Sequence, residues 1–222
     1  MSGQFDVVSF AVLLGALSLM PLLVVCTTSF LKISLVLLVL RNAVGVQQVP
    51  PTLAIYGIAL AMSAFVMAPT VQEIGQRIVA LEAEGSAAGA RTRSAPLLPQ
   101  AGQVFEPLHR FMLKYSRPEQ RELFLASARK LWPADAAREA RATDIMIVIP
   151  AFVVSELQTG YEVGFLIYIP FVVIDLLISN LLMALGMQQV SPQTISIPLK
   201  LLLFVMVDGW GKLLNALALS YV

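Results

Sequence analysis

Residues 45–51 read GVQQVPP and residues 186–192 read GMQQVSP, and each of these short polar stretches interrupts a long apolar run. Five of the seven positions are identical, although the two copies begin 141 residues apart. The glycine that opens each stretch is suited to the left-handed conformation that ends a helix, and the proline that closes it discourages a helix from continuing. Each copy is therefore predicted to be the bend of an apolar helical hairpin. The expected bend residues are Gly45, Pro50, Pro51, Gly186 and Pro192.

The composition is typical of a membrane protein. Of the 222 residues, 58% are hydrophobic and 13% are charged, and the mean hydropathy is +0.80. Soluble domains average about 45–50% apolar and about 25% charged residues. The net charge of +1 gives no reason to expect nucleic acid or an acidic substrate as a partner. Cys26 is the single cysteine, so no intrachain disulfide forms.

Charged residues gather in the middle of the chain. Residues 73–144 hold 11 of the 15 Lys and Arg and 9 of the 14 Asp and Glu. The sequence predicts an N-terminal hydrophobic hairpin over residues 1–72, a polar and mainly helical central domain over 73–144, and a C-terminal hydrophobic hairpin with a tail over 145–222. The expected fold class is an all-α membrane protein in which two apolar helical hairpins flank the central domain.

The apolar runs differ in length. Three of them approach the roughly 20 residues that cross a bilayer core, namely 7–25, 53–71 and 164–187. Three others are shorter, namely 33–40, 145–154 and 195–207. We expect the shorter runs to be half-helices, re-entrant pieces or segments packed inside an assembly, because irregular backbone is not tolerated in contact with lipid.

Two features mark the central segment. Residues 118–132 read PEQRELFLASARKLW and predict an amphipathic helix, with Leu123, Phe124 and Leu131 on its apolar face. This helix is expected either to pack inside the domain or to dock on a neighbouring component. Residues 85–102 are rich in Gly, Ala, Ser and Pro, which predicts a mobile linker.

Basic residues near short connections indicate the cytoplasmic side of a membrane. Lys32 and Arg41 precede the first Gln-Gln stretch, and Lys200 follows the second. Both stretches are therefore expected on the cytoplasmic side. The central domain, which is long enough to translocate, is then expected in the periplasm.

A few charged residues lie in or beside apolar runs: Lys32, Glu156, Asp175, Lys200 and Asp208. Because unpaired charges are costly in a dry interface, Asp175 and Lys200 are expected to form pairs within or between subunits or to line a polar groove. A proton relay is the alternative. Asp208 is expected to cap a turn, while the indole of Trp210 packs or anchors at an interface.

The sequence offers no candidate catalytic centre. His109 is the only histidine, so a metal-ligand partner of the same type is missing. The chain has no Ser/His/Asp set, no phosphate-binding loop and no nucleic-acid motif. We therefore expect a protein that is not an enzyme and that uses neither a cofactor nor a metal.

Four long runs carry a resemblance to a known family: TSFLKISLVLLVLRNAVGVQQVPPTLAIYGIAL (28–60), DIMIVIPAFVVSEL (144–157), FLIYIPFVVIDLLISNLLMALGM (165–187) and VSPQTISIPLKLLLFVMVDGW (190–210). They resemble the R subunit of the type III secretion export apparatus, which is homologous to the flagellar export protein FliP. The resemblance implies a pentamer that joins the S and T subunits in a cone-like entry portal for unfolded secreted proteins. It further implies the bacterial inner membrane as location, and the U switch subunit, the V export-gate subunit and membrane lipid as partners.

The resemblance also implies a constriction. Members of this family carry a motif like GMMM, whose methionines form a gasket round the closed pore. Gly186 and Met187 match this motif, whereas Gln188 and Gln189 replace the methionines that follow. Met187 is carried over as a gasket residue, and the two glutamines are carried over as occupants of the same loop. Amides hydrate more readily than thioethers, so we expect a wetter seal.

A different function is also compatible with two parallel hairpins. A small-solute transporter or channel would place Asp175 and the glutamines at a substrate site. Such a protein is expected to bind its solute as a self-contained monomer or dimer. An export subunit is expected to purify as a large hetero-oligomer with small apolar partners.

Overall fold

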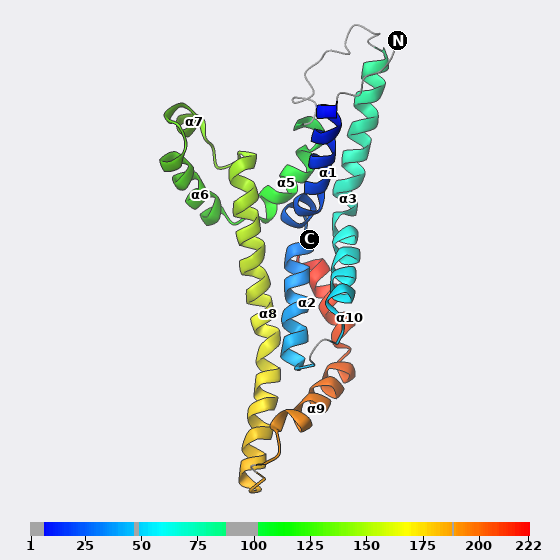
Figure 1. Ribbon diagram of the computed structural model, residues 1–222, viewed down its shortest axis with the longest axis vertical. Coiled ribbons are helices and arrows are strands. Elements are labelled where there is room, and N and C mark those ends of the chain that lie inside the picture. The colour runs from blue at the N-terminus through cyan, green and yellow to red at the C-terminus, as the bar shows by residue number, and fades with distance from the viewer. Residues whose placement is uncertain (1–6, 47–48, 88–101, 188) are drawn as a thin grey trace.

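The computed structural model describes residues 7–46, 49–87, 102–187 and 189–222. Within these ranges the chain forms helices and no strands, and the molecule is elongated (Figure 1). The N-terminal helices are α1 (Val7–Thr27), α2 (Phe30–Val44) and α3 (Thr52–Ala87). The middle contains α5 (Glu106–Tyr115), α6 (Pro118–Leu131) and α7 (Ala134–Glu139). The C-terminal part is α8 (Ile145–Ala184), α9 (Pro192–Met206) and α10 (Gly209–Leu219).

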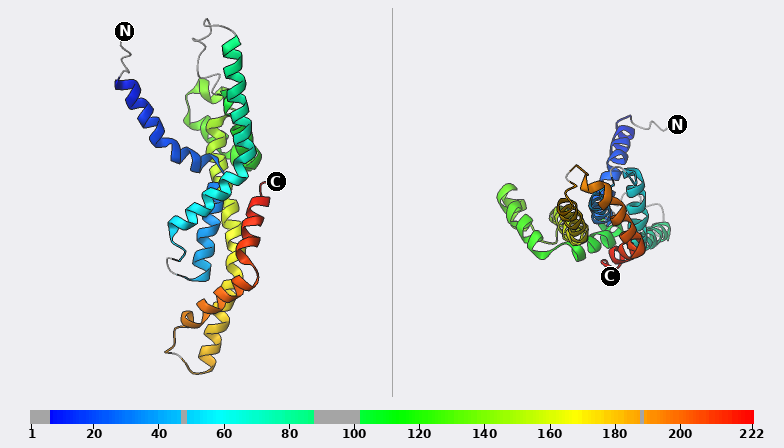
Figure 2. Two further views of the ribbon diagram at one scale, coloured as in Figure 1. Left: turned by 90° about the vertical axis from the view of Figure 1, so that its right-hand side faces the viewer. Right: turned by 90° about the horizontal axis from the view of Figure 1, so that it is seen from below.

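The predicted all-α membrane class is confirmed. Two stretches, Thr52–Leu81 in α3 and Ile145–Ala184, are long and apolar enough to cross a membrane. Two pairs of shorter helices also meet that test when taken together, but the α1–α2 pair bends by 71° and the α9–α10 pair by 62°. Figure 2 shows α1 leaning away from the rest of the molecule at its bend.

The expectation that residues 145–154 form a separate short piece is wrong. They open α8, which continues without a break for 40 residues and contains both Pro150 and Pro170. An internal proline costs a helix one hydrogen bond, but a long apolar helix held by neighbours tolerates that loss. The helix α3 also contains an internal proline, Pro69, and continues without a break from Thr52 to Ala87.

The helix α2 lies at the centre of the lower bundle, between α3, α8 and α10 (Figure 1). Its apolar side chains form a core with α3 and α10, made of Ile33, Val36, Leu37, Ile55, Ala59 and Leu217. On the α8 side, Gly160 and Gly164 face Leu35 and Val39 so closely that a Cβ atom at Gly164 would lie 3.1 Å from Val39 Cγ1. Small residues one turn apart thus let the two backbones approach.

The helices α6 and α7 form an arm beside one end of α8 (Figure 1). The predicted helix over 118–132 is present, but its buried side matches the expected one only in part. Leu125 and Ala128 are buried against Ile147 of α8, whereas Leu123 is 57% exposed and Leu131 is 80% exposed. Phe124, the third residue of the predicted face, does pack against this cluster. Most of the expected linker, residues 88–101, lies outside the described residues.

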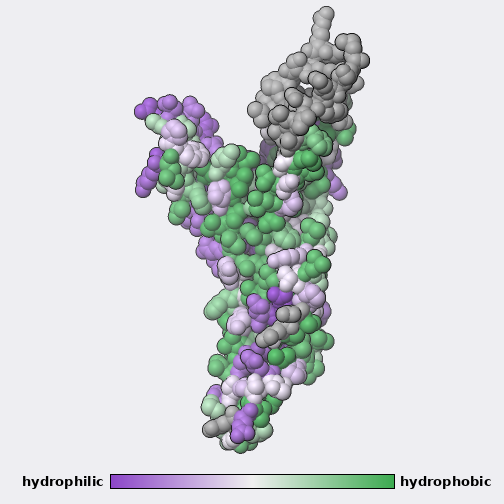
Figure 3. Space-filling view, in the orientation of Figure 1, coloured by the Kyte–Doolittle hydropathy of each residue, from purple (hydrophilic) through white to green (hydrophobic). Residues whose placement is uncertain are grey.

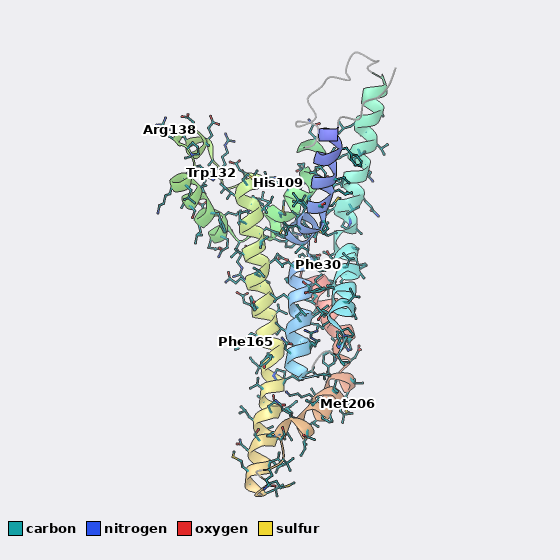
Figure 4. The ribbon with its side chains drawn as sticks, viewed as in Figure 1. Phe30, His109, Trp132, Arg138, Phe165 and Met206 are labelled. Carbon is teal, nitrogen blue, oxygen red and sulfur yellow. The ribbon has the colours of Figure 1, made fainter. Side chains whose placement is uncertain are left out.

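Large apolar side chains cover much of the outer surface. Figure 3 shows hydrophobic residues along the body of the molecule and hydrophilic ones on the α6–α7 arm. Phe165 and Met206, labelled in Figure 4, are 66% and 77% exposed on α8 and α9. Monomeric soluble proteins rarely expose such continuous apolar surface. These faces therefore require lipid or protein neighbours.

Candidate functional site

A helix ends next to the glycine that opens each polar stretch. The helix α2 ends at Gly45, whose φ is +84°, and α8 ends before Gly186, whose φ is +71°. At the second bend, the N–H of Met187 donates to Leu182 O at 2.9 Å and the N–H of Gly186 donates to Met183 O at 3.1 Å. These two bonds are the Schellman pattern, in which a left-handed residue closes the helix.

The prolines of both stretches lie at the starts of the following helices. Pro51 immediately precedes α3, and its carbonyl accepts hydrogen bonds from the N–H groups of Ala54 and Ile55. Pro192 is the first residue of α9, a position where the missing N–H costs nothing. Pro50 lies within the turn.

Both bends point toward the same end of the molecule, and the α8–α9 bend lies further out (Figure 1). Its apolar residues are unprotected: Met183 is 61%, Leu185 63% and Met187 45% exposed. Gln189 is exposed as well. Gln47, Gln48 and Gln188 lie outside the described residues.

A buried cluster joins four distant parts of the chain. Lys32 Nζ of α2 lies 3.8 Å from Glu156 Oε1 of α8, and both side chains are 3% exposed. The Tyr221 hydroxyl donates to Glu156 Oε2, and Lys32 Nζ lies 3.5 Å from the centre of the Tyr221 ring. The Tyr115 hydroxyl of α5 donates in turn to the carbonyl of Tyr221. The lysine charge is therefore balanced by a carboxylate and an aromatic face.

A second ion pair links α8 to α9. Lys200 Nζ donates to Asp175 Oδ2 at 2.6 Å and to the carbonyl of Ala43 at 3.2 Å, at the end of α2. The lysine side chain is 5% exposed and the aspartate side chain is 44% exposed. The pair therefore lies within a single chain, with its carboxylate on the more open side.

Asp208, which was expected to cap a turn, occupies the N-cap position of α10. It stands before α10 at the 62° bend, with φ at +52°, and its side chain makes no capping hydrogen bond. Asp tolerates the left-handed conformation better than most residues do, which suits it to a sharp turn. The indole of Trp210 packs edge-on against Phe204, with ring centres 5.4 Å apart.

Comparison with known proteins identifies the family. Residues 13–217 match the FliP family over most of the chain. The chain belongs to the FliP family. It is 52% identical over 212 residues to the harpin secretion protein HrpW of Pseudomonas syringae pv. syringae, covering 96% of this chain and 99% of that protein. The harpin secretion protein HrcR of Erwinia amylovora is 48% identical over 219 residues, covering 99% and 98%.

A third relative is similar over almost the same length. The Yop proteins translocation protein R of Yersinia pestis is 41% identical over 216 residues and covers 97% of each chain. The resemblance to the R subunit of the type III secretion apparatus is thereby confirmed. These relatives match along their whole length, so the hairpins and the central segment belong together as one family unit.

Sequence reasoning missed the tyrosines that complete the buried cluster in this FliP-family chain. Tyr115 and Tyr221 lie 106 positions apart, and no local pattern relates them to each other or to Glu156. A weak signal was available, because a buried acid and a buried lysine on separate apolar helices require further hydrogen-bonding partners. Aromatic residues with a polar tip are well suited to that role.

A second charge cluster, also missed, ties α3 to the central helices. Arg77 Nη2 lies 2.9 Å from Glu73 Oε1 and 2.7 Å from Glu106 Oε2, and Arg110 Nη2 also contacts both carboxylates. The pKa of Glu106 is lowered, chiefly by its hydrogen bond from Arg110 and also by the positive charge of Arg77. This cluster is half-exposed and fastens α5 to the end of α3. No group of three His, Cys, Asp or Glu side chains able to hold a metal occurs among the described residues.

Proposed function

We propose that the chain is the core pore-forming subunit of the type III secretion export gate and gives unfolded proteins a path across the bacterial inner membrane. The proposed assembly is a pentamer of this chain with S and T subunits, later joined by the U and V subunits. The role is structural rather than enzymatic. Family membership supports the coarse assignment to type III secretion, and the shape of the α8–α9 bend supports the pore.

The observation that carries this proposal is the bare apolar tip at the α8–α9 bend. Met183, Leu185 and Met187 are all more than two-fifths exposed at the far end of the longest helix. A single chain has no reason to present such residues to water, because their burial is favourable by roughly 25 cal/mol per Å². Five tips meeting on one axis would bury them against each other and close the pore.

In the proposed gate, Met187, Gln188 and Gln189 surround the constriction. The flexible thioether of Met187 suits a seal that must adapt to varied chains, while an amide at 189 can hydrogen-bond to passing backbone. The bends are fixed by Gly45, Pro50, Pro51, Gly186 and Pro192. The ion pairs Lys32–Glu156 and Lys200–Asp175 hold α2, α8 and α9 in register. Asp208 sets the angle between α9 and α10.

Native mass spectrometry of a detergent extract tests the assembly. The proposed gate predicts a complex containing about five copies of this chain with smaller apolar subunits. A monomer or homodimer that binds a small solute would instead identify a transporter. Because the apolar surface is extensive, extraction in two detergents of different harshness separates true stoichiometry from dissociation.

The orientation of the central segment is proposed to be periplasmic, from the basic residues near the bends. A cysteine in place of the exposed Ala126 on α6, in a Cys26→Ala background, provides the test. An impermeant thiol reagent applied from the periplasm is expected to label it. Labelling that requires a permeabilised inner membrane would reverse the orientation.

A further inference from the structure

A polar cavity lies where the end of α2 meets α8 and α9. Its volume is about 510 Å³, and its lining includes Arg41, Tyr168, Asp175, Gln193, Ser196 and Lys200. Small-molecule and cofactor sites have volumes of about 300–1,000 Å³. The cavity is therefore large enough for a ligand, and three of its lining residues are charged.

The cavity opens in an apolar setting. Leu176 follows Asp175 on α8, and Leu199 and Leu201 flank Lys200 on α9, and all three leucines are exposed. Figure 3 shows a hydrophilic area interrupting the hydrophobic surface of the lower part of the molecule. Polar groups that face lipid or apolar protein are costly unless a partner satisfies them. The occupant must therefore bring polar groups into the cavity and apolar groups alongside it.

The positive side of the cavity is Arg41. Its Nη1 donates to Thr52 Oγ1 at 2.9 Å, which uses one of the five N–H donors of a guanidinium. The remaining donors form a planar fork that matches phosphate. Lys200 is a weaker candidate for phosphate, because it is buried and already donates to Asp175 and to Ala43.

The negative side is Asp175. Its Oδ2 accepts from Lys200, and the side chain is 44% exposed and lines the cavity, so the carboxylate can accept a further hydrogen bond. A purely anionic ligand would meet this carboxylate, and a purely cationic ligand would meet Arg41. A zwitterion with a phosphate and a primary ammonium satisfies both, because each of its charged groups finds an opposite charge.

We propose that this cavity binds the headgroup of phosphatidylethanolamine, with the phosphate on Arg41 and the ammonium on Asp175. The acyl chains lie along the exposed leucines of α8 and α9. The bound lipid joins α2, α8 and α9 next to the first bend. This inference concerns a lipid held by the subunit, and it stands whether or not the chain forms an export pore.

The purified complex, incorporated in nanodiscs with equal amounts of phosphatidylethanolamine, phosphatidylcholine and phosphatidylglycerol, tests the proposal. Lipids retained after release from the nanodisc are counted by native mass spectrometry. Phosphatidylethanolamine is expected to be enriched about tenfold, because phosphatidylcholine lacks ammonium hydrogens and phosphatidylglycerol lacks the ammonium, and one charge-assisted hydrogen bond is worth about that factor. Equal retention of the three lipids, or preference for phosphatidylglycerol, would overturn the assignment.

Substitutions then locate the site. Arg41→Gln is expected to reduce the retention of phosphatidylethanolamine about tenfold. Retention by Arg41→Lys is expected to lie between that of the parent and that of Arg41→Gln, because lysine keeps the charge but lacks the planar set of N–H donors. Thr52→Ala removes the partner of Arg41 but leaves its guanidinium in place, so retention should not change. Arg129→Gln, on the exposed face of α6, controls for lost charge. Unchanged retention in both Arg41 variants would contradict the site, and Arg41→Lys remains informative if Arg41→Gln does not assemble.

A final comparison separates the lipid from its soluble headgroup. Free O-phosphoethanolamine carries the same charges without the acyl chains. It is expected to displace the lipid only at concentrations at least about a hundredfold higher, because it gains nothing from the apolar surface beside the cavity. If it binds as tightly as the lipid, the ligand is a soluble phosphoamine and the lipid assignment is wrong.

Discussion

Tyr221 donates a hydrogen bond from its hydroxyl to Glu156, although 65 positions separate the two residues. The same tyrosine ring lies under the ammonium of Lys32, 3.5 Å from ring centre to nitrogen. The segment after α10 is thereby fastened to α2 and α8 at the middle of the bundle. A bend of 62° between α9 and α10 is held in place by this distant contact as well as by local geometry.

The first prediction separates the hydroxyl of Tyr221 from its ring. Tyr221→Phe removes the hydrogen bond to Glu156 and keeps the ring under Lys32, so we expect a loss of about 1.5–3 kcal/mol, as for a bond to a charged group. Tyr221→Ala also empties a buried space, and we expect about 3–5 kcal/mol. Thermal unfolding of the detergent-solubilised protein measures both. Tyr161→Phe, at an exposed site on α8, is the control. Equal stability of Tyr221→Phe and the parent would mean that the hydroxyl of Tyr221 does not stabilise the fold.

The second prediction concerns the asymmetry of the pair between Asp175 and Lys200. Asp175→Ala leaves a buried ammonium with only the Ala43 carbonyl, and an unpaired buried charge typically costs about 3–5 kcal/mol. Lys200→Met leaves a carboxylate that is 44% exposed and can be solvated, so the loss should be smaller. Asp175→Asn keeps a hydrogen bond and should be milder than Asp175→Ala. The yield of assembled complex is the measurement.

One combination of results would change the interpretation of this pair. If Asp175→Ala and Asp175→Asn both assemble normally but abolish secretion, the pair does not hold the structure together. A proton-linked role for Asp175 would then gain support. If Lys200→Met is more damaging than Asp175→Ala, the buried lysine is not the costly partner.

The third prediction concerns the contact between α2 and α8. A Cβ atom at Gly164 would lie 3.1–3.3 Å from three atoms of Val39, which is β-branched and therefore stiff. Gly164→Ala is expected to destabilise by about 1–3 kcal/mol through overpacking. Val39→Ala in the same chain should restore most of that loss. Gly75→Ala in α3, where a Cβ atom meets nothing within 4 Å, should be neutral or stabilising by up to about 1 kcal/mol.

The same contact shows which parts of the fold the sequence could predict. The bends at Gly45 and Gly186 follow from local chemistry, since a glycine and a nearby proline specify a helix end without help from the rest of the chain. The continuity of α8 could not be predicted that way. Pro150 and Pro170 are local signals for a break, and they are overruled by the packing of α8 along α2, which depends on residues more than 100 positions away.

The candidate site divides along the same line. The sequence identified each charge that lies in an apolar run, because such residues are conspicuous wherever they occur. It did not identify the hydroxyl groups of Tyr115 and Tyr221, which distant parts of the chain bring to the buried cluster. Nor did it identify the cavity around Arg41, which forms only where α2, α8 and α9 meet. The face predicted for α6 is only partly right for a related reason: Phe124 packs against the buried cluster, whereas Leu123 and Leu131 are apolar in the sequence but stay exposed in this chain.

The fourth prediction concerns pH. The pKa of Glu106 is lower in the folded protein than in the unfolded chain, so its ion pairs stabilise the fold above the unfolded pKa of about 4.3 and lose this contribution as pH falls further, through the folded value. The stability difference between the parent and Glu106→Gln should be constant from pH 7 to pH 5 and shrink below about pH 4.3. High salt should reduce it at every pH, because the cluster is half-exposed.

A control for the pH experiment is Glu122→Gln, at an exposed position on α6. This substitution also removes one carboxylate, but one that forms no ion pair among the described residues, so it isolates the effect of the charge cluster. Thermal unfolding in matched detergent at each pH supplies the data. A difference for Glu106→Gln that grows as the pH falls would mean that the carboxyl is better stabilised protonated than ionised, which contradicts the lowered pKa.

The last prediction compares the two bends. If five copies of the α8–α9 tip close the pore, changing Met187, Gln188 and Gln189 together to alanine removes the side chains that fill the axis. The closed gate should then leak ions and small dyes, and the complex should still assemble, because Met187 and Gln189 are exposed in the chain. The equivalent change at positions 46–48 should not leak, since the first bend packs beside α9, with Gly45 near Ile197.

A second variant tests whether more apolar side chains at the same bend tighten the closed gate. Methionine at both 188 and 189 exchanges hydrated amides for adaptable apolar side chains, and it should lower the residual conductance of the closed complex below that of the parent. Conductance of reconstituted complexes and dye entry into cells are measured for all three variants, with complex yield as the check on assembly. A leak from the 46–48 variant alone would assign the pore to the first bend, and tight closure in every variant would remove the gasket from the proposed function. A converging α8–α9 tip requires two results together. The alanine variant at 187–189 must be the only one that leaks, and the methionine variant must conduct less than the parent.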